Sequence, residues 1–293
     1  MLILRGHTDA IRCLSYSPNG RYLASGSEDN TARLWDFAAG GSLTATLEHP
    51  ASVETLGFAP DGDALLTGTS AGKLHAWDLA SQNEQASAWG SEQGIRSLLH
   101  ISNKGDGEML VTAGWDRSVK IWNYPMLAQR PFKQIEPQCV ALSWDPIQRR
   151  LAIGEANGNV ILYDLDTRSI RRNFGSLLPL SALAWSPDGQ LLAFGHTDGT
   201  VNLCSLPLLE GSRRLDGHTW TIYALAFTPD SRTLISGGAD STVRLWDVAT
   251  GREKRCFRWH KSWVTCAAVA PDGMTAAAGS ADHTLVVWDL DED

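Results

Sequence analysis

The sequence has few of the features that mark a secreted, membrane or nucleic-acid-binding protein. Five cysteines are scattered over 293 residues, an odd number that argues against a disulfide framework and favours a reducing compartment, so we expect a cytoplasmic protein. No apolar run is long enough to span a bilayer, and no signal-peptide pattern opens the chain. The net charge of −8 disfavours specific nucleic-acid binding. We expect a monomer that binds no membrane.

Motifs for metals and phosphates are also missing. Four of the eight histidines share one repeated position, and the other four, which follow no short ligand spacing, are His75, His100, His196 and His283. No glycine-rich phosphate loop occurs. The segment "GDGE" at Gly105–Glu108 is interpreted as a hairpin turn rather than a calcium loop. We therefore expect no metal and no other cofactor.

The sequence does contain an internal repeat, centred on many of its twelve tryptophans. The stretch "GSEDNTARLWD", which ends at Asp36, returns as "GGADSTVRLWD" and as "GSADHTLVVWD". Weaker copies align on the same aspartate or its substitute, 41 to 45 residues apart, and together they fill residues 1–293 as one domain. The seven aligned positions are Asp36, Asp78, Asn123, Asp164, Ser205, Asp247 and Asp289.

Each copy predicts short strands separated by tight turns. In the first, "IRCLSYS", "YLASG" and "TARLW" predict three strands, and a fourth strand follows the aspartate in each internal copy. A single four-stranded sheet of this size cannot bury both of its faces. Stacking the copies around an axis places each sheet between two neighbours.

These motifs resemble those of the WD40-repeat family along the whole chain. The resemblance rests on "GH" at Gly6–His7 and Gly217–His218, and on "WD" at four positions, Trp35–Asp36, Trp77–Asp78, Trp246–Asp247 and Trp288–Asp289. It implies an all-β, seven-bladed propeller with four-stranded blades. Only "LDED" follows the last aligned aspartate, which is too short for a fourth strand. We therefore expect Leu2–Arg5 to supply the outer strand of the last blade.

The family resemblance also implies a hydrogen-bond chain of Asp, His, Ser or Thr, and Trp in each blade. Complete sets are Asp29, His7, Ser25 and Trp35 in copy one, and Asp240, His218, Ser236 and Trp246 in copy six. Partial sets are His49, Thr67 and Trp77 with Ala71 in copy two; Thr112, Asp116 and Trp122 with Ser91 in copy three; and His260, Asp282 and Trp288 with Ala278 in copy seven. Copies four and five lose it, with Ile135, Ile153, Tyr163, Ser176, Phe194 and Cys204 at these positions.

A Ser–His–Asp trio also suggests a hydrolase. The trio recurs, however, at fixed offsets from a tryptophan, whereas a catalytic triad is needed once. We therefore interpret it as a buried polar network that fixes geometry.

The innermost strand of the first copy departs from strict alternation. Its apolar positions Ile11, Leu14 and Tyr16 predict a bulge near Arg12–Cys13. The column that follows the bulge is uniformly small, which suits a crowded axis: Cys13, Thr55, Ser97, Ala141, Ala182, Ala224 and Cys266. Cys13 and Cys266 come from neighbouring blades, so a disulfide is one alternative, but the composition favours free thiols.

Family members commonly bind partners on the face that carries the "GH" loops and the aspartate turns. Three columns of residues project there by analogy. The first is Arg12, Glu54, Arg96, Val140, Ser181, Tyr223 and Thr265; the second is Ala10, Ser52, Gly94, Gln138, Pro179, Thr221 and Trp263; the third is Glu28, Ser70, Trp115, Ala156, Thr197, Ala239 and Ala281.

Most of these residues are small, and the exceptions are candidates for partner binding because aromatic residues and arginine dominate interface hot spots. The candidates are Arg12, Glu28, Glu54, Arg96, Trp115, Trp220, Tyr223 and Trp263. We expect a patch where blades six, seven and one meet. The alternative is that Trp220 and Trp263 fold over and pack on neighbouring loops.

The sequence therefore favours a non-catalytic scaffold that binds a protein or peptide on one face. One alternative is a sensor or regulatory module of a larger signalling protein. Another is an enzyme with a site in the central funnel, but Arg12, Glu54 and Arg96 have no paired nucleophile or base. Basic outer strands, "TRSIRRNF", "GSRRLDG" and "GREKRCFRW", suggest either an anionic partner or charge that protects sheet edges, and we favour protection.

Overall fold

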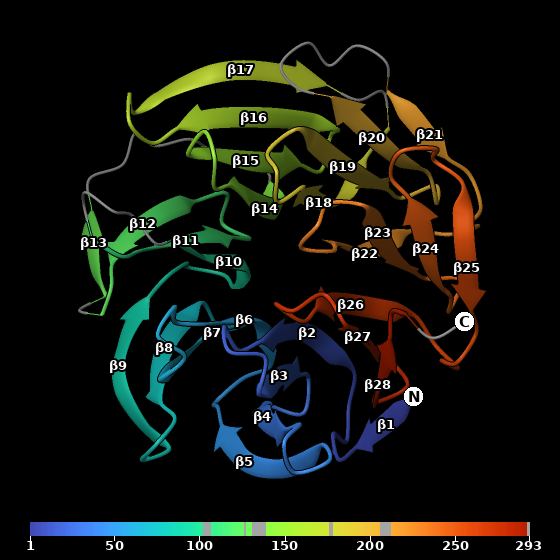
Figure 1. Ribbon diagram of the computed structural model, residues 1–293. Coiled ribbons are helices and arrows are strands. Elements are labelled where there is room, and N and C mark those ends of the chain that lie inside the picture. The colour runs from blue at the N-terminus through green and yellow to red at the C-terminus, as the bar shows by residue number, and fades with distance from the viewer. Residues whose placement is uncertain (102–106, 126, 131–138, 176–177, 206–211, 292–293) are drawn as a thin grey trace.

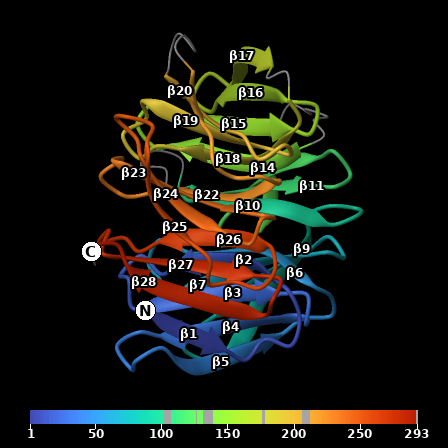
Figure 2. The same cartoon turned by 90° about the vertical axis from the view of Figure 1, so that its right-hand side faces the viewer.

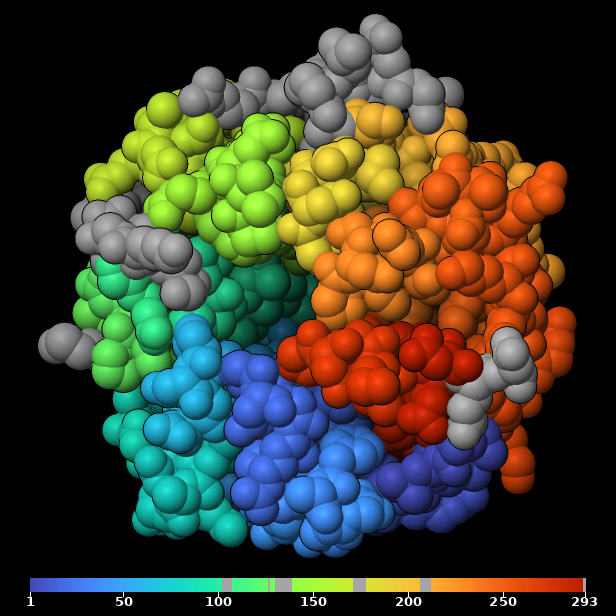
Figure 3. Space-filling model, viewed as in Figure 1, coloured from blue at the N-terminus to red at the C-terminus, as the bar shows by residue number. Residues whose placement is uncertain are grey.

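The computed structural model describes residues 1–101, 107–125, 127–130, 139–175, 178–205 and 212–291. These residues form seven antiparallel four-stranded sheets arranged as the blades of a ring (Figure 1). Figure 3 shows the blades packed side by side around a central hollow. The all-β, seven-bladed propeller predicted from the repeats is confirmed. The described residues contain no helix that is long and apolar enough to cross a membrane.

The strands follow one another outward from the axis in each blade. Blades one to three are β2 (Ile11–Tyr16), β3 (Tyr22–Ser27), β4 (Thr31–Asp36) and β5 (Ser42–Glu48); β6 (Val53–Phe58), β7 (Ala64–Thr69), β8 (Lys73–Asp78) and β9 (Asn83–Trp89); and β10 (Ile95–Ile101), β11 (Met109–Gly114), β12 (Val119–Asn123) and β13 (Ala128–Arg130).

Blades four to six repeat this order. They are β14 (Cys139–Asp145), β15 (Arg150–Glu155), β16 (Asn159–Asp164) and β17 (Ser169–Gly175); β18 (Leu180–Trp185), β19 (Leu191–His196), β20 (Val201–Ser205) and β21 (Arg213–Leu215); and β22 (Ile222–Phe227), β23 (Thr233–Gly238), β24 (Val243–Asp247) and β25 (Glu253–Phe257). The third strand of every blade ends at the residue on which the repeats align.

Blade seven combines the two ends of the chain. It contains β26 (Val264–Val269), β27 (Thr275–Ser280), β28 (Thr284–Asp289) and, as its outer strand, β1 (Leu2–Arg5). β1 pairs with β28 in antiparallel register, from Leu2 opposite Val287 to Arg5 opposite Thr284. Both termini lie at this blade (Figure 2). The predicted closure by Leu2–Arg5 is therefore confirmed.

The core lies between the blades. Seven separate clusters of buried apolar side chains occupy the seven junctions between neighbouring blades. Glycines in the second strands allow the close approach: a Cβ on Gly26 would lie 2.6 Å from Cγ1 of Val53 in blade two, and one on Gly279 would lie 2.8 Å from Cγ2 of Ile11 in blade one. A methyl group at either position would force neighbouring blades apart.

The predicted bulge is present, and it recurs in every blade. The pairing of β2 with β3 shifts between Ile11 and Cys13, and the innermost strands of the other six blades shift at the corresponding place. Cys13 and Cys266 are both free, as are the other three cysteines, so the disulfide alternative is not formed. At the junction of blades seven and one, Thr265 Oγ1 donates hydrogen bonds to the carbonyls of Ile11 and Gly279.

Deletion of residues 1–5 should unzip the outer edge of blade seven. The deletion exposes the groups that pair with β1 and removes the buried side chain of Leu4, at a cost of about 2–3 kcal/mol or more from apolar burial alone. Thermal melting should show a lower midpoint. Leu4→Ala should reproduce part of the loss and Ile3→Ala, at an exposed position of the same strand, little of it. Equal melting of the truncated and intact chains would refute the role of β1.

Candidate functional site: the mouth of the central funnel

One end of the ring gathers the three columns of projecting residues. In six blades the backbone N–H of the third column donates to the carbonyl of the second column at 2.8–3.2 Å, as in Glu28 to Ala10 and Trp115 to Gly94. In blade four, Gln138 lies outside the described residues. These bonds hold the turn after the second strand beside the start of the innermost strand, at the same end of each blade.

The bulges direct one residue per blade toward the axis. Seven innermost strands stand side by side, each touching those of both neighbouring blades, so the bulge residues meet at the funnel mouth. They enclose a cavity of about 330 Å³ together with two tryptophans. The lining residues are Arg12, Glu54, Arg96, Trp115, Val140, Ser181, Tyr223, Trp263 and Thr265.

Charged groups cluster on the side of blades one to three. The guanidinium of Arg12 lies 3.4 Å from Oε2 of Glu54 and 3.5 Å from Oε1 of Glu28, measured from Nε. Glu54 is the more buried of the two carboxylates. The positive charge of Arg12 is therefore balanced by two carboxylates, those of Glu54 and Glu28.

Arg96 is held differently. Its Nε donates to the carbonyl of Val140 in blade four at 2.9 Å, and the guanidinium lies 5.5 Å from the centre of the Trp115 ring, a cation–π distance. Burial lowers the pKa of Arg96 because desolvation disfavours the charged form. Among the residues that the structure describes, Arg96 forms no ion pair with a carboxylate.

Aromatic residues occupy the side of blades six and seven. The rings of Tyr223 and Trp263 are 5.9 Å apart and tilted by 36°. Tyr223 is 38% exposed and Trp263 50% exposed, whereas Trp115 across the funnel is 54% exposed. Trp220 is 65% exposed, but it stands in the loop before β22 and does not line the cavity.

The structure thus brings together six of the eight candidate residues around one cavity. Glu28 lies beside the cavity through its contact with Arg12, and Trp220 is apart. Sequence reasoning omitted Val140, Ser181 and Thr265, which complete the lining. All three belong to the column that starts with Arg12, and this shared position indicates that they line the cavity. Their small side chains are not typical of interface hot spots, so the residue types alone do not identify them.

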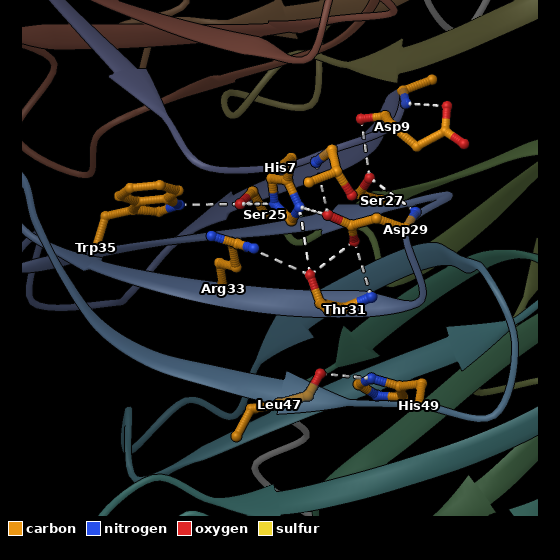
Figure 4. A network of polar contacts seen from close by, with 12 residues as sticks. His7, Asp9, Ser25, Ser27, Asp29, Thr31, Arg33, Trp35, Leu47 and His49 are labelled. Carbon is orange, nitrogen blue, oxygen red and sulfur yellow. Dashed lines mark hydrogen bonds and ion pairs between the residues drawn. The ribbon is translucent and has the colours of Figure 1, made fainter.

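The recurrent His, Asp, Ser and Trp residues form the predicted chain in blade one (Figure 4). Trp35 Nε1 donates to Ser25 Oγ at 2.9 Å, the Ser25 hydroxyl donates to His7 Nε2 at 2.7 Å, and His7 Nδ1 donates to Asp29 at 2.8 Å. Burial would raise the pKa of Asp29, but hydrogen bonds from Thr31 and His7 lower it to about 2. Burial lowers the pKa of His7 despite the carboxylate.

Blade six repeats this geometry and the partial copies show where it fails. His218 contacts Ser236 at 2.7 Å and Asp240 at 2.9 Å. In blade two, with Ala71 in place of aspartate, His49 Nδ1 donates instead to the carbonyl of Leu47 at 2.9 Å. Blade three keeps the bond from Trp122 to Thr112, at 2.9 Å, and Asp116 accepts from the backbone N–H of Glu92 at 2.8 Å. Ile135 and Ser176 lie outside the described residues. The serines of blades one and six are buried with their tryptophans, as a structural network requires.

Blade seven shows the consequence of one substitution. Ala278 provides no hydroxyl, and among the described residues both His260 Nε2 and Trp288 Nε1 are buried without a hydrogen-bond partner. His260 Nδ1 still lies 3.3 Å from Asp282. The hydrogen-bond chain of blade seven is thus broken between Trp288 and His260 and intact between His260 and Asp282.

The basic outer strands use much of their charge locally. Arg213 donates to the carbonyls of Val248 and Ala249 at 2.6 and 2.7 Å, Arg214 pairs with Asp216 at 2.6 Å, and Lys254 donates to Thr233 at 2.9 Å. These contacts agree with a protective role at the sheet edges. No group of three or more potential metal-binding side chains occurs in the described part of the chain.

Comparison with known proteins identifies the family. A family model described as WD40, "WD domain, G-beta repeat", matches residues 1–36, 41–78, 89–123, 171–205, 210–247 and 251–289. The chain belongs to the WD40 repeat family. The unmatched repeat is the fourth, where Ile153 and Tyr163 replace the hydroxyl residue and the tryptophan, yet it forms a blade of the same four strands. WD40 propellers are generally non-catalytic scaffolds for protein interactions.

Similarity to individual proteins is short. The chain is 62% identical over 37 residues to "Ribosome biogenesis protein BOP1" of Rattus norvegicus and 57% identical over 37 residues to that of Homo sapiens. It is 51% identical over 39 residues to "Ribosome biogenesis protein BOP1 homolog" of Drosophila virilis. Each match covers 13% of this chain and 5% of the relative. This is about the length of one WD40 repeat, so the matches reflect the repeat itself.

Restoring the hydroxyl in blade seven should stabilise the protein. Ala278→Ser gives Trp288 an acceptor and His260 a donor, and we expect a gain of about 1–2 kcal/mol. Ala277→Ser, buried on the opposite face of β27 in an apolar junction, should give no gain. His218→Ala, which removes one hydrogen-bond partner each from Ser236 and Asp240, should cost on the order of 1–3 kcal/mol. Thermal melting tests all three, and a destabilising Ala278→Ser would show that the orphaned atoms are otherwise satisfied.

The buried histidines should make the fold sensitive to mild acid. Burial lowers the pKa of His49 from 6.5 to about 4. The folded state then binds fewer protons than the unfolded state, so stability is complete above about pH 6.5 and falls as the pH drops toward 4. We expect a loss on the order of 1–2 kcal/mol from His49 alone at pH 5. Melting curves at pH 7 and pH 5 should show a smaller difference for His49→Gln, and an unchanged difference would contradict this assignment.

Proposed function

We propose that this chain is a non-catalytic scaffold that holds a protein or peptide over the mouth of its central funnel. The observation that supports this most is the convergence of one residue from every blade, with Trp115 and Trp263, on a single cavity at one end of the ring. A concave site with aromatic walls and a few directed polar groups is typical of ligand binding.

The residue types support binding rather than catalysis. The cavity combines exposed Tyr and Trp rings with arginine, the side chains that contribute most to interface affinity. Its small hydroxyls already donate to backbone carbonyls, Ser181 to Gly195 and Thr265 to Gly279, and Glu54 faces Arg12. No nucleophile is paired with a base among the lining residues.

The mounting of these side chains also supports recognition. The bulge residues belong to strands, not to long loops, and strands position a site more rigidly. Tyr223 and Trp263 support each other by ring contact. A partner therefore meets a preformed surface and loses little affinity to ordering it. We expect the chain to act here as a monomer, and the same surface would serve a regulatory module within a larger signalling protein.

Alanine at Tyr223 or Trp263 should weaken partner binding by about 2 kcal/mol or more if both are hot spots. Proteins captured from an extract of the source cells by the wild type and by the Tyr223→Ala/Trp263→Ala variant would be compared by quantitative mass spectrometry. Trp89→Ala is the matched control, since Trp89 is 67% exposed but lies on the outer strand β9.

We expect the partner to be lost from the double variant and retained by the control. A partner that still binds the double variant at full strength would contradict the proposed face. Unfolding of the double variant, detected by circular dichroism, would assign both rings to packing instead.

A further inference from the structure

We propose that the funnel mouth binds a carboxylate, carried by the side chain of an aspartate or glutamate within a partner peptide, and that Arg96 receives it. This inference rests on the proposed function and adds the chemistry of the partner to it. It assigns Arg96, on the wall formed by blade three, as the anchor for the acid, and the aromatic pair on the opposite wall as the contact for a neighbouring residue of the peptide.

Arg96 is the charged residue of the cavity that forms no ion pair with a described carboxylate, and Glu54 acts on it only from beyond ion-pair distance. Arg12 has Glu54 and Glu28 within 3.5 Å, whereas Arg96 has no carboxylate among the described residues. A guanidinium offers five N–H donors. One, on Nε, is used by the carbonyl of Val140, and the other four form no hydrogen bond with a described protein group. A partly buried cation in this state is stabilised by any anion that reaches it.

The position of Arg96 favours a carboxylate over other acceptors. The carbonyl of Val140 fixes the guanidinium at Nε, and the ring of Trp115 lies against it at 5.5 Å, so its orientation is set before a ligand arrives. A planar, oriented guanidinium matches the two oxygens of a carboxylate. Burial already lowers the pKa of Arg96, and a bound anion would offset this cost of desolvation.

The opposite wall determines the neighbour of the acidic residue. In a ring of seven blades, blade three faces the junction of blades six and seven, and Figure 1 shows β10 across the axis from β22 and β26. A peptide that crosses the mouth with its acid at Arg96 would therefore place an apolar or aromatic residue on Tyr223 and Trp263. A crossing chain continues on both sides, which favours a side-chain carboxylate over a free C-terminus.

A cationic ligand fits the same surface less well. Aromatic rings attract cations, but the acid within the cavity, Glu54, already faces Arg12. Arg96 would repel an added cation, because in a cavity of only about 330 Å³ the two charges lie closer together than the distance over which salt screens them. The cavity is at the lower end of the sizes of ligand pockets, so it suits one or two side chains rather than a folded surface.

The test uses four pools of fluorescein-labelled nonapeptides with random flanking residues. Three pools are capped at both ends and carry glutamate, glutamine or lysine at the central position; the fourth has a glutamine centre and a free C-terminal carboxylate. Binding is measured to the immobilised full chain and to Arg96→Gln, Arg96→Lys and Arg117→Gln. Arg117 is the matched control because it is exposed on the turn that follows Trp115 and does not line the cavity.

We expect the wild type to retain the glutamate pool at least about tenfold better than the glutamine and lysine pools. Arg96→Gln should abolish this preference, Arg96→Lys should keep part of it, and Arg117→Gln should keep all of it. Circular dichroism establishes that each variant is folded, and Arg96→Lys serves as the test if Arg96→Gln is not.

The other outcomes are decisive as well. The assignment of Arg96 is overturned if the wild type retains the glutamate and glutamine pools equally. It is also overturned if the preference survives in folded Arg96→Gln, or if it is undiminished in Arg96→Lys. Preference for the lysine pool identifies a cation site, and preference for the free C-terminus overturns the side-chain source. If binding depends on Tyr223 and Trp263 but not on the central charge, only this inference fails. If the wild type retains no pool, the inference and the proposed face fail together.

Discussion

Every blade depends on its two neighbours to bury its faces. A four-stranded sheet of 20 or so residues has too little apolar area to be stable alone, and the seven clusters of the core all lie between blades, none within one. An incomplete ring would leave the apolar faces of its two end blades exposed. The ring must therefore close for every blade to be buried on both faces. Pairing of β1 with β28 meets it by making the first residues and the last blade one sheet.

Close packing between blades also determines where variation is tolerated. The second-strand glycines and the small residues near the axis are confined by the neighbouring blade. A Cβ placed on Gly26 illustrates this, since it would lie only 2.6 Å from Cγ1 of Val53. The residue at each bulge is released from pairing and points to the funnel mouth. It is therefore free to differ between blades, and here it ranges from Arg12 to Val140 to Tyr223. Close packing therefore keeps the blades alike where they touch and concentrates their differences in the bulge residues, which line one cavity.

Much of the fold could be predicted from the sequence because each signal is repeated. The spacing of Ile11, Leu14 and Tyr16 predicted a bulge that all seven blades contain, and the loss of a hydroxyl at Ala278 predicted the broken network of blade seven. Repetition supplies seven independent readings of one pattern, so errors in a single copy matter little.

The site was less predictable because it depends on contacts between blades. The columns identified which side chains share a face, but not that Arg12 reaches both Glu28 and Glu54, or that Arg96 turns to the carbonyl of Val140 in the next blade. Trp220 shares the loop of a candidate column, yet it remains outside the lining. Such contacts are decided by side-chain conformation and by the angle between blades, and a periodic pattern encodes neither.

The polar networks connect stability with the site. They are complete in blades one and six, which carry Arg12 and Tyr223, and each ties a "GH" loop to the turn before the third strand. Glu28, which pairs with Arg12, directly precedes Asp29 of the blade-one network, so the bond that His7 donates to Asp29 also holds the carboxylate side of the cavity in place. Blades four and five have lost the network and contribute only Val140 and Ser181. The network of blade one thus fixes the backbone beside one wall of the cavity, and side chains at a binding site bind tightly only when their backbone is fixed.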